Sequence, residues 1–238
     1  MSFRHTTTFA IAAAAALLSG VALAQAEDLK VTITNLTKGQ PISPPVVVSH
    51  RKSIALATPG EPASEGLRFV AEDGNPDPLA QALEGLSQVR DVAVADGAVP
   101  PSQSTTVFLR ARRGDVISAV GMLVNTNDAF FFLDSQRQPF LRAVEVEVAA
   151  WDSGTEANTE VCDDIPGPAC GAPNARSTES AEGFVHVHRG VHGANVEADG
   201  EEADLRPELY DWRNPSVRIT IERARRGKDD AEDEDDNG

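Results

Sequence analysis

The chain has 238 residues, with 37 Asp and Glu against 21 Lys and Arg, so its formal net charge is −16. This balance argues against nucleic acid and anionic lipid as partners, because both require a basic surface. The length allows one large domain or two small ones.

The first 26 residues have the pattern of a secretory signal peptide. Arg4 and His5 form a short basic start, an apolar run extends from Phe9 to Leu23, and small residues at 22–24 and 24–26 form two cleavage-type triplets. The run is too short for a membrane span, and no second apolar run approaches about 18 residues. We therefore expect an exported protein, secreted or periplasmic, with no membrane span.

Alternating apolar and polar residues predict a series of short strands. In the first, Val31 and Ile33 alternate with threonines, which is typical of a half-buried strand. The run 115–124 is apolar on both faces near its end, so we expect it to be central in a sheet. The predicted strands are 28–36, 46–50, 104–112, 115–124, 130–133, 142–149 and 216–223.

Residues 51–78 are rich in Pro, Gly and Glu and predict mainly loop. One short helix should begin at Asp77, which can cap it, with Pro78 at its first position. Short strands, one helix and many Gly/Pro loops together predict an all-β fold, an antiparallel β-sandwich over 27–226. Residues 229–236 hold seven acids in eight positions and cannot build a core, so we expect residues 227–238 to form a disordered tail.

Three acids in the middle of the chain suggest a metal site. Asp128 stands just before an apolar run, and Asp152 and Glu156 lie four residues apart in a loop that contains Gly154. The glycine lets the backbone fold back so that both loop carboxylates can face one ion. Ca²⁺ takes six to eight oxygen ligands, which three carboxylates with loop carbonyls and water can supply. The alternative is that these are solvated or capping acids.

Cys162 and Cys170 are the only cysteines. In an exported protein we expect them to form a disulfide, which would stabilise a local loop by about 2–3 kcal/mol. A thiol metal or redox pair is the weaker alternative, because the spacing is not C-x-x-C.

A histidine cluster occurs in the segment GFVHVHRGVHG. His186 and His188 share a face if the segment is a strand, and His192 follows after a glycine. Imidazole ligands in this pattern suit Zn²⁺ or Cu²⁺, which makes a periplasmic transition-metal protein an alternative function. The other interpretation is that these histidines form hydrogen bonds within the loops.

Catalytic motifs are absent from the sequence. It contains no G-x-S-x-G and no glycine-rich phosphate loop before a helix, and the cysteines are expected to pair. We therefore expect a protein that is not an enzyme.

Five segments, in order along residues 31–221, resemble the spondin domain, the N-terminal module of F-spondin and mindin that also occurs in single-domain bacterial proteins. They are VTITNLTKGQPISPPVVVSH, NTNDAFFFLDS, AAWDSGTEANTE, GFVHVHRGVHG and YDWRNPSVRITI. The resemblance implies a C2-like antiparallel β-sandwich and a Ca²⁺ ion held by Asp128, Asp152 and Glu156.

The chain differs from that family pattern at the predicted site. Trp151, Ser153 and Glu156 stand where the family has Tyr, Ala and Asp, and Ala129 stands where an aromatic residue is common. The resemblance also implies an extracellular role in adhesion or recognition, with a protein or glycan surface as the partner. Fold and family alone do not establish that role.

Overall fold

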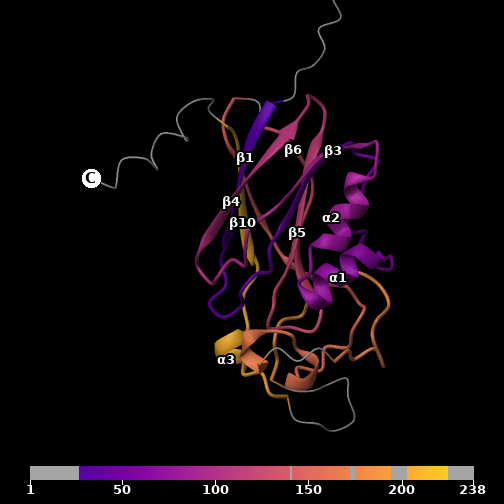
Figure 1. The fold of residues 1–238 in the computed structure, drawn as a ribbon. Coiled ribbons are helices and arrows are strands. Elements are labelled where there is room, and N and C mark those ends of the chain that lie inside the picture. The colour runs from indigo at the N-terminus through magenta and orange to yellow at the C-terminus, as the bar shows by residue number, and fades with distance from the viewer. Residues whose placement is uncertain (1–26, 140, 172–174, 194–202, 225–238) are drawn as a thin grey trace, which may run out of the picture.

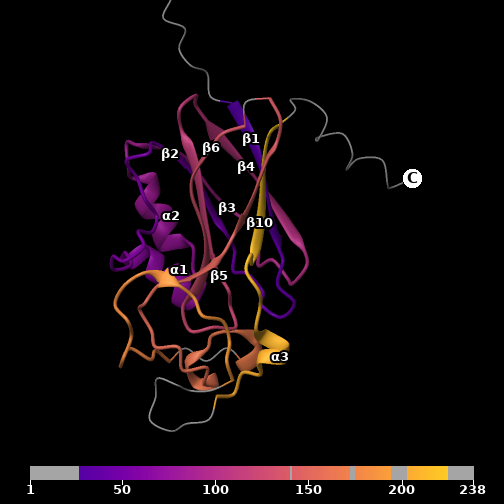
Figure 2. The same cartoon turned by 180° about the vertical axis from the view of Figure 1, so that it is seen from behind.

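Two antiparallel sheets packed face to face form the body of the molecule (Figures 1 and 2). The computed structural model describes residues 27–139, 141–171, 175–193 and 203–224. The predicted signal peptide lies outside the described residues, as does the predicted acidic tail. The all-β sandwich expected from the strand pattern is confirmed.

The smaller sheet has four strands in the order β4-β1-β10-β7. Its inner face is apolar because the strands alternate; Val31 of β1 pairs with Ile221 of β10, and Ile33 pairs with Ile219. Its strands are β1 (Glu27–Asn35), β4 (Ser104–Ala111), β7 (Val144–Val148) and β10 (Val217–Arg223).

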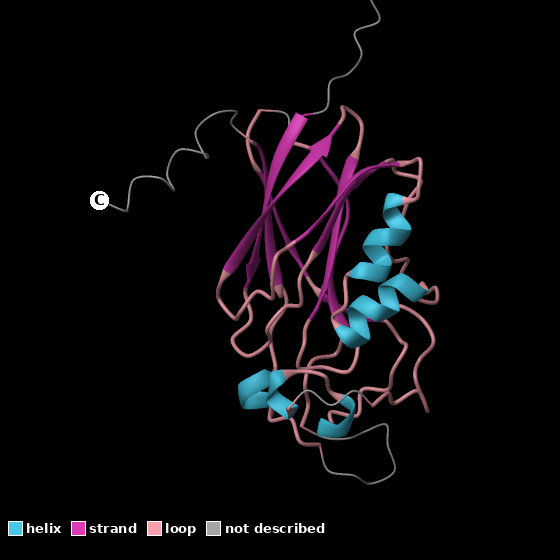
Figure 3. Cartoon of the chain, viewed as in Figure 1, coloured by secondary structure: helices cyan, strands magenta, loops and turns pink. Residues whose placement is uncertain are grey.

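The larger sheet has six strands in the order β3-β2-β5-β6-β8-β9. The other sheet covers one of its faces and two helices cover the other (Figure 3). Every residue of β5 is buried, as its two apolar faces predicted. The strands are β2 (Val46–His50), β3 (Val89–Val94), β5 (Val116–Met122), β6 (Ala129–Arg137), β8 (Ala150–Asp152) and β9 (His186–Val187).

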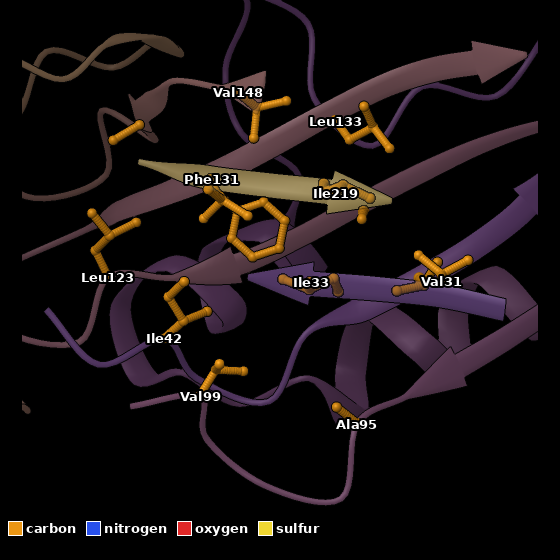
Figure 4. Packing of buried hydrophobic residues seen from close by; sticks show 14 of the residues in the cluster. Val31, Ile33, Ile42, Ala95, Val99, Leu123, Phe131, Leu133, Val148 and Ile219 are labelled. Carbon is orange, nitrogen blue, oxygen red and sulfur yellow. The ribbon is translucent and has the colours of Figure 1, made fainter. Parts of the chain in front are cut away.

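Apolar side chains from both sheets fill the interior. The ring of Phe131 lies in the middle of this cluster, with Ile33 and Ile219 contributed by the opposite sheet (Figure 4). Phe130 and Phe132 point the other way and pack beneath the helices. Successive phenylalanines of β6 therefore serve two cores, since side chains alternate across a strand.

Two helices cover the outer face of the larger sheet: α1 (Glu65–Asp73) and α2 (Asp77–Glu84). The predicted helix from Asp77 is confirmed, whereas α1 corrects the expectation of loop over 51–78. The Ser64 hydroxyl accepts a hydrogen bond from the Leu67 N–H at the start of α1, and Gly74 ends it in a left-handed conformation. These capping residues were hidden by the surrounding Pro and Gly.

Long connections gather at one end of the sandwich, below the sheets in Figure 1. They hold two 3₁₀ turns and α3 (Pro207–Tyr210). The two 3₁₀ turns, η1 (Cys162–Asp164) and η2 (Pro168–Cys170), are joined by the Cys162–Cys170 disulfide, which confirms that prediction. We call this region the loop end. The described chain begins and ends at the opposite end of the sandwich.

Candidate metal centre

Three neighbouring strands bring the predicted acids and one histidine to the loop end. β8 lies between β6 and β9, and its last residue, Asp152, pairs with Ala129 on one side and His186 on the other. Asp128 immediately precedes Ala129, and its carbonyl accepts a hydrogen bond from the Ser153 N–H at 3.3 Å. Strand pairing therefore places Asp128, Asp152 and His186 side by side.

Asp128 is fully buried. Its Oδ2 accepts hydrogen bonds from the Ser153 hydroxyl at 2.8 Å, the Thr155 N–H at 2.8 Å and the Glu156 N–H at 3.1 Å. Its Oδ1 is also buried but has no hydrogen-bond partner in the described structure. A buried carboxylate oxygen without a partner is costly, so this atom marks a place where a cation or a proton is needed.

Asp152 is also fully buried, and its carboxylate is held from two sides. Oδ1 accepts the Gly154 N–H at 2.8 Å, and Oδ2 accepts the Asn158 side-chain amide at 2.7 Å. Gly154 has φ +67°, and a Cβ there would come within 2.3 Å of the Phe184 carbonyl oxygen. The turn that aims both loop acids therefore requires glycine at this position.

Burial disfavours the simultaneous ionisation of the Asp128 and Asp152 carboxyls. It raises the pKa of Asp128 well above its usual value, and the neighbouring Asp152 charge raises it further. Burial likewise raises the pKa of Asp152 to about 6; the hydrogen bond from Asn158 lowers it and the charge of Glu182 raises it. Neither carboxylate has an ion pair with Lys or Arg among the described residues. A divalent cation would supply the missing positive charge.

Glu156, the third predicted ligand, is buried but has different neighbours. Its N–H donates to Asp128, whereas its Oε1 accepts the Ser177 N–H at 2.9 Å. Burial raises the pKa of Glu156 to about 8, and the charge of Glu72 contributes next. The structure thus brings Asp128 and Asp152 together. The Glu156 carboxylate lies close enough to both Asp128 and a second charged cluster to be influenced by each.

That second cluster surrounds Glu72 of α1, which is almost fully buried. Arg176 binds both of its oxygens, Nε at 2.6 Å and Nη2 at 2.5 Å, and Arg68 adds a contact of 2.8 Å one turn earlier in the helix. We call these three residues the Glu72 cluster. It ties the loop around residue 176 to α1, and sequence reasoning missed it because no local pattern connects residues a hundred positions apart.

A mixed set of ligands lies beside the aspartate pair. Asp152, Glu182 and His186 each offer an atom within 4.8 Å of the other two; in the described part of the chain, it is the only such triple of His, Cys, Asp or Glu. His186 Nε2 lies 3.6 Å from Asp152 Oδ1 and 3.5 Å from Glu182 Oε1. Glu182 was missed in the sequence, where its only signal is its place four residues before His186.

The remaining histidines are engaged elsewhere, as the hydrogen-bonding interpretation expected. His188 is buried, with Nε2 bonded to Asn158 Oδ1 at 2.8 Å and Nδ1 accepting the Gly190 N–H at 2.9 Å. Burial lowers the pKa of His188 to about 3, so it is neutral and both of its nitrogens are used. His192 Nε2 lies 3.1 Å from the Arg189 carbonyl oxygen. Therefore the structure does not gather His186, His188 and His192 into one ligand set.

Fold and site together define a class of protein: a β-sandwich module that carries a charged site in the loops at one end. A family model described as Spondin_N, the spondin N-terminal domain, matches residues 37–165, more than half of the chain. The chain therefore belongs to the spondin N-terminal domain family, as the five sequence segments indicated. This is a family of extracellular recognition modules and not of enzymes.

Two further findings frame this assignment. No curated protein matches the chain. None of the helices in the described residues is long and apolar enough to cross a membrane.

Proposed function

We propose that the protein is an exported, non-catalytic recognition module whose loop end is held in shape by one Ca²⁺ ion. One observation carries the proposal. Asp128 is fully buried with its Oδ1 unpaired, beside a second buried carboxylate and with no Lys or Arg ion pair in the described structure. Burying a charged group without a partner of opposite charge is strongly unfavourable, because the group loses its hydration.

Asp128 and Asp152 are the principal ligands in this proposal, and Glu156 is the third. Ca²⁺ prefers carboxylate and carbonyl oxygens and tolerates irregular geometry, which suits acids drawn from two loops. When bound, the ion supplies two positive charges that keep the aspartates ionised. The Thr155 and Glu156 N–H groups already fix the Asp128 carboxylate in position, so binding needs little reorganisation on that side.

Ordering of the loops connects the ion to recognition. Binding residues are commonly carried on loops that a rigid scaffold positions, and the sandwich is such a scaffold. In this proposal the ion holds together the loops that carry Asp128 and Asp152, because two ionised carboxylates buried side by side would otherwise repel each other. The partner we propose is a protein or glycan surface outside the cell, bound in a Ca²⁺-dependent way.

Calorimetry and thermal unfolding of the full chain, after treatment with a chelator, test the ion. We expect one Ca²⁺ to bind and to raise Tm by mass action. Asp128→Ala and Asp152→Ala should lose both effects, whereas Asp134→Ala, which removes an exposed acid of β6, should keep them. If Asp152→Ala bound Ca²⁺ as tightly as the wild type, the proposed site would be wrong.

A pull-down from the host's cell envelope, with and without chelator, tests recognition. The wild type should retain a partner only when Ca²⁺ is present, and Asp128→Ala should retain none. Capture that persists unchanged in chelator and in this variant would show that the ion does not organise the binding surface.

The alternative function, a periplasmic Cu²⁺ or Zn²⁺ protein that uses His186, His188 and His192, is less well supported. His188 has both ring nitrogens hydrogen-bonded, although its Nε2 also lies 3.8 Å from Asp152 Oδ2. Of the three histidines, only His186 belongs to the candidate ligand set found among the described residues. Tight binding of Cu²⁺ or Zn²⁺ that depends on all three histidines would favour this alternative. Binding that depends on His186 but not on His188 and His192 would not favour it.

A further inference from the structure

The geometry points to a second metal site, of the transition-metal type, formed by Asp152, Glu182 and His186. Zn²⁺ is the ion that we choose to probe it. The site shares Asp152 with the proposed Ca²⁺ site but does not require Ca²⁺ to be bound. It differs from both metal sets expected from the sequence, because it takes one residue from each and adds Glu182.

The spacing of the donor atoms carries the inference. Two ligand atoms bound tetrahedrally to Zn²⁺ at about 2.1 Å lie about 3.4 Å apart. His186 Nε2 lies 3.6 Å from Asp152 Oδ1 and 3.5 Å from Glu182 Oε1. Both distances from the imidazole nitrogen are therefore close to the separation of two ligands on one small ion, and the carboxylate oxygens of the set lie within 4.8 Å of each other. Neither contact is a hydrogen bond.

The hydrogen bonds of His186 select the nitrogen that would bind the ion. Its Nδ1 lies 3.1 Å from the Val187 carbonyl oxygen, which can only accept, so Nδ1 carries the proton. Nε2 then presents a lone pair toward two carboxylates. A backbone carbonyl on one imidazole nitrogen and a metal on the other is the common arrangement at histidine metal sites.

Unpaired buried atoms give independent support. His186 Nε2 and Glu182 Oε2 are buried, and each lacks a hydrogen-bond partner in the described structure. A lone pair that faces carboxylates without an ion or proton between them is repulsive. A bound cation satisfies these groups at once.

The surroundings position the ligands close to the surface. The Gly154 N–H fixes Asp152 Oδ1 at 2.8 Å, and the Phe184 ring packs against the His186 imidazole with 5.4 Å between centroids. The His186 side chain is 30% exposed and that of Glu182 is 23% exposed, so the ligand set lies at the edge of the buried region, directly beneath the surface. Two carboxylates and an imidazole leave a coordination position for water or for a group from a partner. The imidazole favours Zn²⁺ over Ca²⁺, which prefers oxygen ligands.

The test uses the full chain without a His tag, treated with chelator and then titrated with Zn²⁺ in millimolar Ca²⁺. We expect one Zn²⁺ to bind, with affinity at least about 100-fold weaker in His186→Ala and about 10-fold or more weaker in Glu182→Gln, as for lost metal contacts. His192→Ala is the matched control and should bind as the wild type does. Circular dichroism and Tm measured without metal confirm that each variant is folded.

Asp128→Asn separates this proposal from the proposed Ca²⁺ site. It should lose Ca²⁺ binding and keep Zn²⁺ binding, whereas His186→Ala should lose Zn²⁺ and keep Ca²⁺. Absence of stoichiometric Zn²⁺ in the wild type, or equal binding in His186→Ala, would overturn the site. Loss of Ca²⁺ binding alone would leave the Zn²⁺ site standing.

Discussion

Glu72 and Asp128 are both buried carboxylates in the same protein, yet they are neutralised in different ways. Glu72 is contacted by Arg68 and Arg176 at 2.5–2.8 Å. Asp128 has backbone and hydroxyl donors on one oxygen, no hydrogen-bond donor from the described residues on the other, and a second carboxyl beside it. Within the described part of the chain, arginine counter-ions are present for Glu72 and absent for Asp128, which is the pattern expected where an external cation binds.

Glu156 connects the two regions. Its backbone N–H donates a hydrogen bond to Asp128. The charge of Glu72 raises the pKa of its carboxyl, and the charge of Arg176 lowers it. A change in the charge of either region should therefore change the pKa of Glu156. This coupling makes the comparison testable, because charge removal should have opposite effects on stability in the two regions.

The largest effect on stability is expected from Arg176→Met. This change leaves the buried Glu72 carboxylate with less compensating positive charge, so that it resembles Asp128. The methionine keeps the apolar stem but removes the guanidinium that binds both Glu72 oxygens. Removing one partner of a fully buried ion pair costs about 3–5 kcal/mol. Because the Arg176 side chain is 43% exposed and Arg68 is retained, we expect a loss of about 2–3 kcal/mol. Urea unfolding in chelator measures the loss.

Arg142→Met is the control, because Arg142 is exposed and has no ion pair among the described residues. It should change the free energy of unfolding by no more than about 0.5 kcal/mol. If Arg176→Met were as mild as this control, the Glu72 cluster would not contribute to stability, and the contrast between the two regions would disappear.

Much of the sandwich could be predicted from the sequence, because alternation reports which face of a strand is buried. Seven strands were found in this way. β3 was missed because all six of its residues are half-buried, so its alternation is weak. The short β8 and β9 depend on tertiary pairing that leaves no local pattern, and α1 was hidden by Pro and Gly around Ser64.

The site was predictable only where a motif carries it. Asp128 and Asp152 stand in segments that resemble a family, and the structure brings them together. Glu182 and Arg176 reach their partners through the path of a long loop, which no periodicity records. His186 and His188 look alike in the sequence, yet one faces carboxylates while the other has both nitrogens bonded.

The second effect concerns pH in metal-free protein. Burial raises the pKa of Asp152 from 3.8 to about 6 and that of Glu156 from 4.5 to about 8, so the folded state binds protons more tightly than the unfolded state. The stability linked to this difference is fully present below about pH 4 and is lost as pH rises through 6 and 8. The lowered pKa of His188 acts in the opposite direction over this range but is the smaller effect.

Chelated protein should therefore unfold at a lower temperature at pH 8 than at pH 5.5, by a net amount equivalent to about 1–3 kcal/mol. Saturating Ca²⁺ should weaken or reverse this trend, because the ion binds the ionised carboxylates and competes with protons. Thermal scans across this range, with and without Ca²⁺, provide the measurement. A chelated protein whose Tm rises steadily from pH 5.5 to 8 would contradict the burial of uncompensated acids.

The smallest effect is also the most specific, because it has an unusual sign. Asp128→Asn removes one charge from the uncompensated pair, while its amide oxygen can still accept the Thr155 and Glu156 N–H groups. The amide nitrogen then occupies the place of the unpaired Oδ1 and can donate toward Asp152. In chelator at pH 8 we expect the variant to be more stable than the wild type by about 1 kcal/mol, since folding no longer buries this ionisable carboxyl beside Asp152.

In saturating Ca²⁺ the order should reverse, because only the wild type gains stability from the ion. Paired urea titrations in chelator and in Ca²⁺ measure both arms, with Asp134→Asn as an exposed control that should stay within about 0.5 kcal/mol of the wild type in each. If Asp128→Asn destabilised the protein in chelator by more than that control, the Asp128 carboxylate would be a hydrogen-bonding element of the fold, and the case for a cation at its free oxygen would fail.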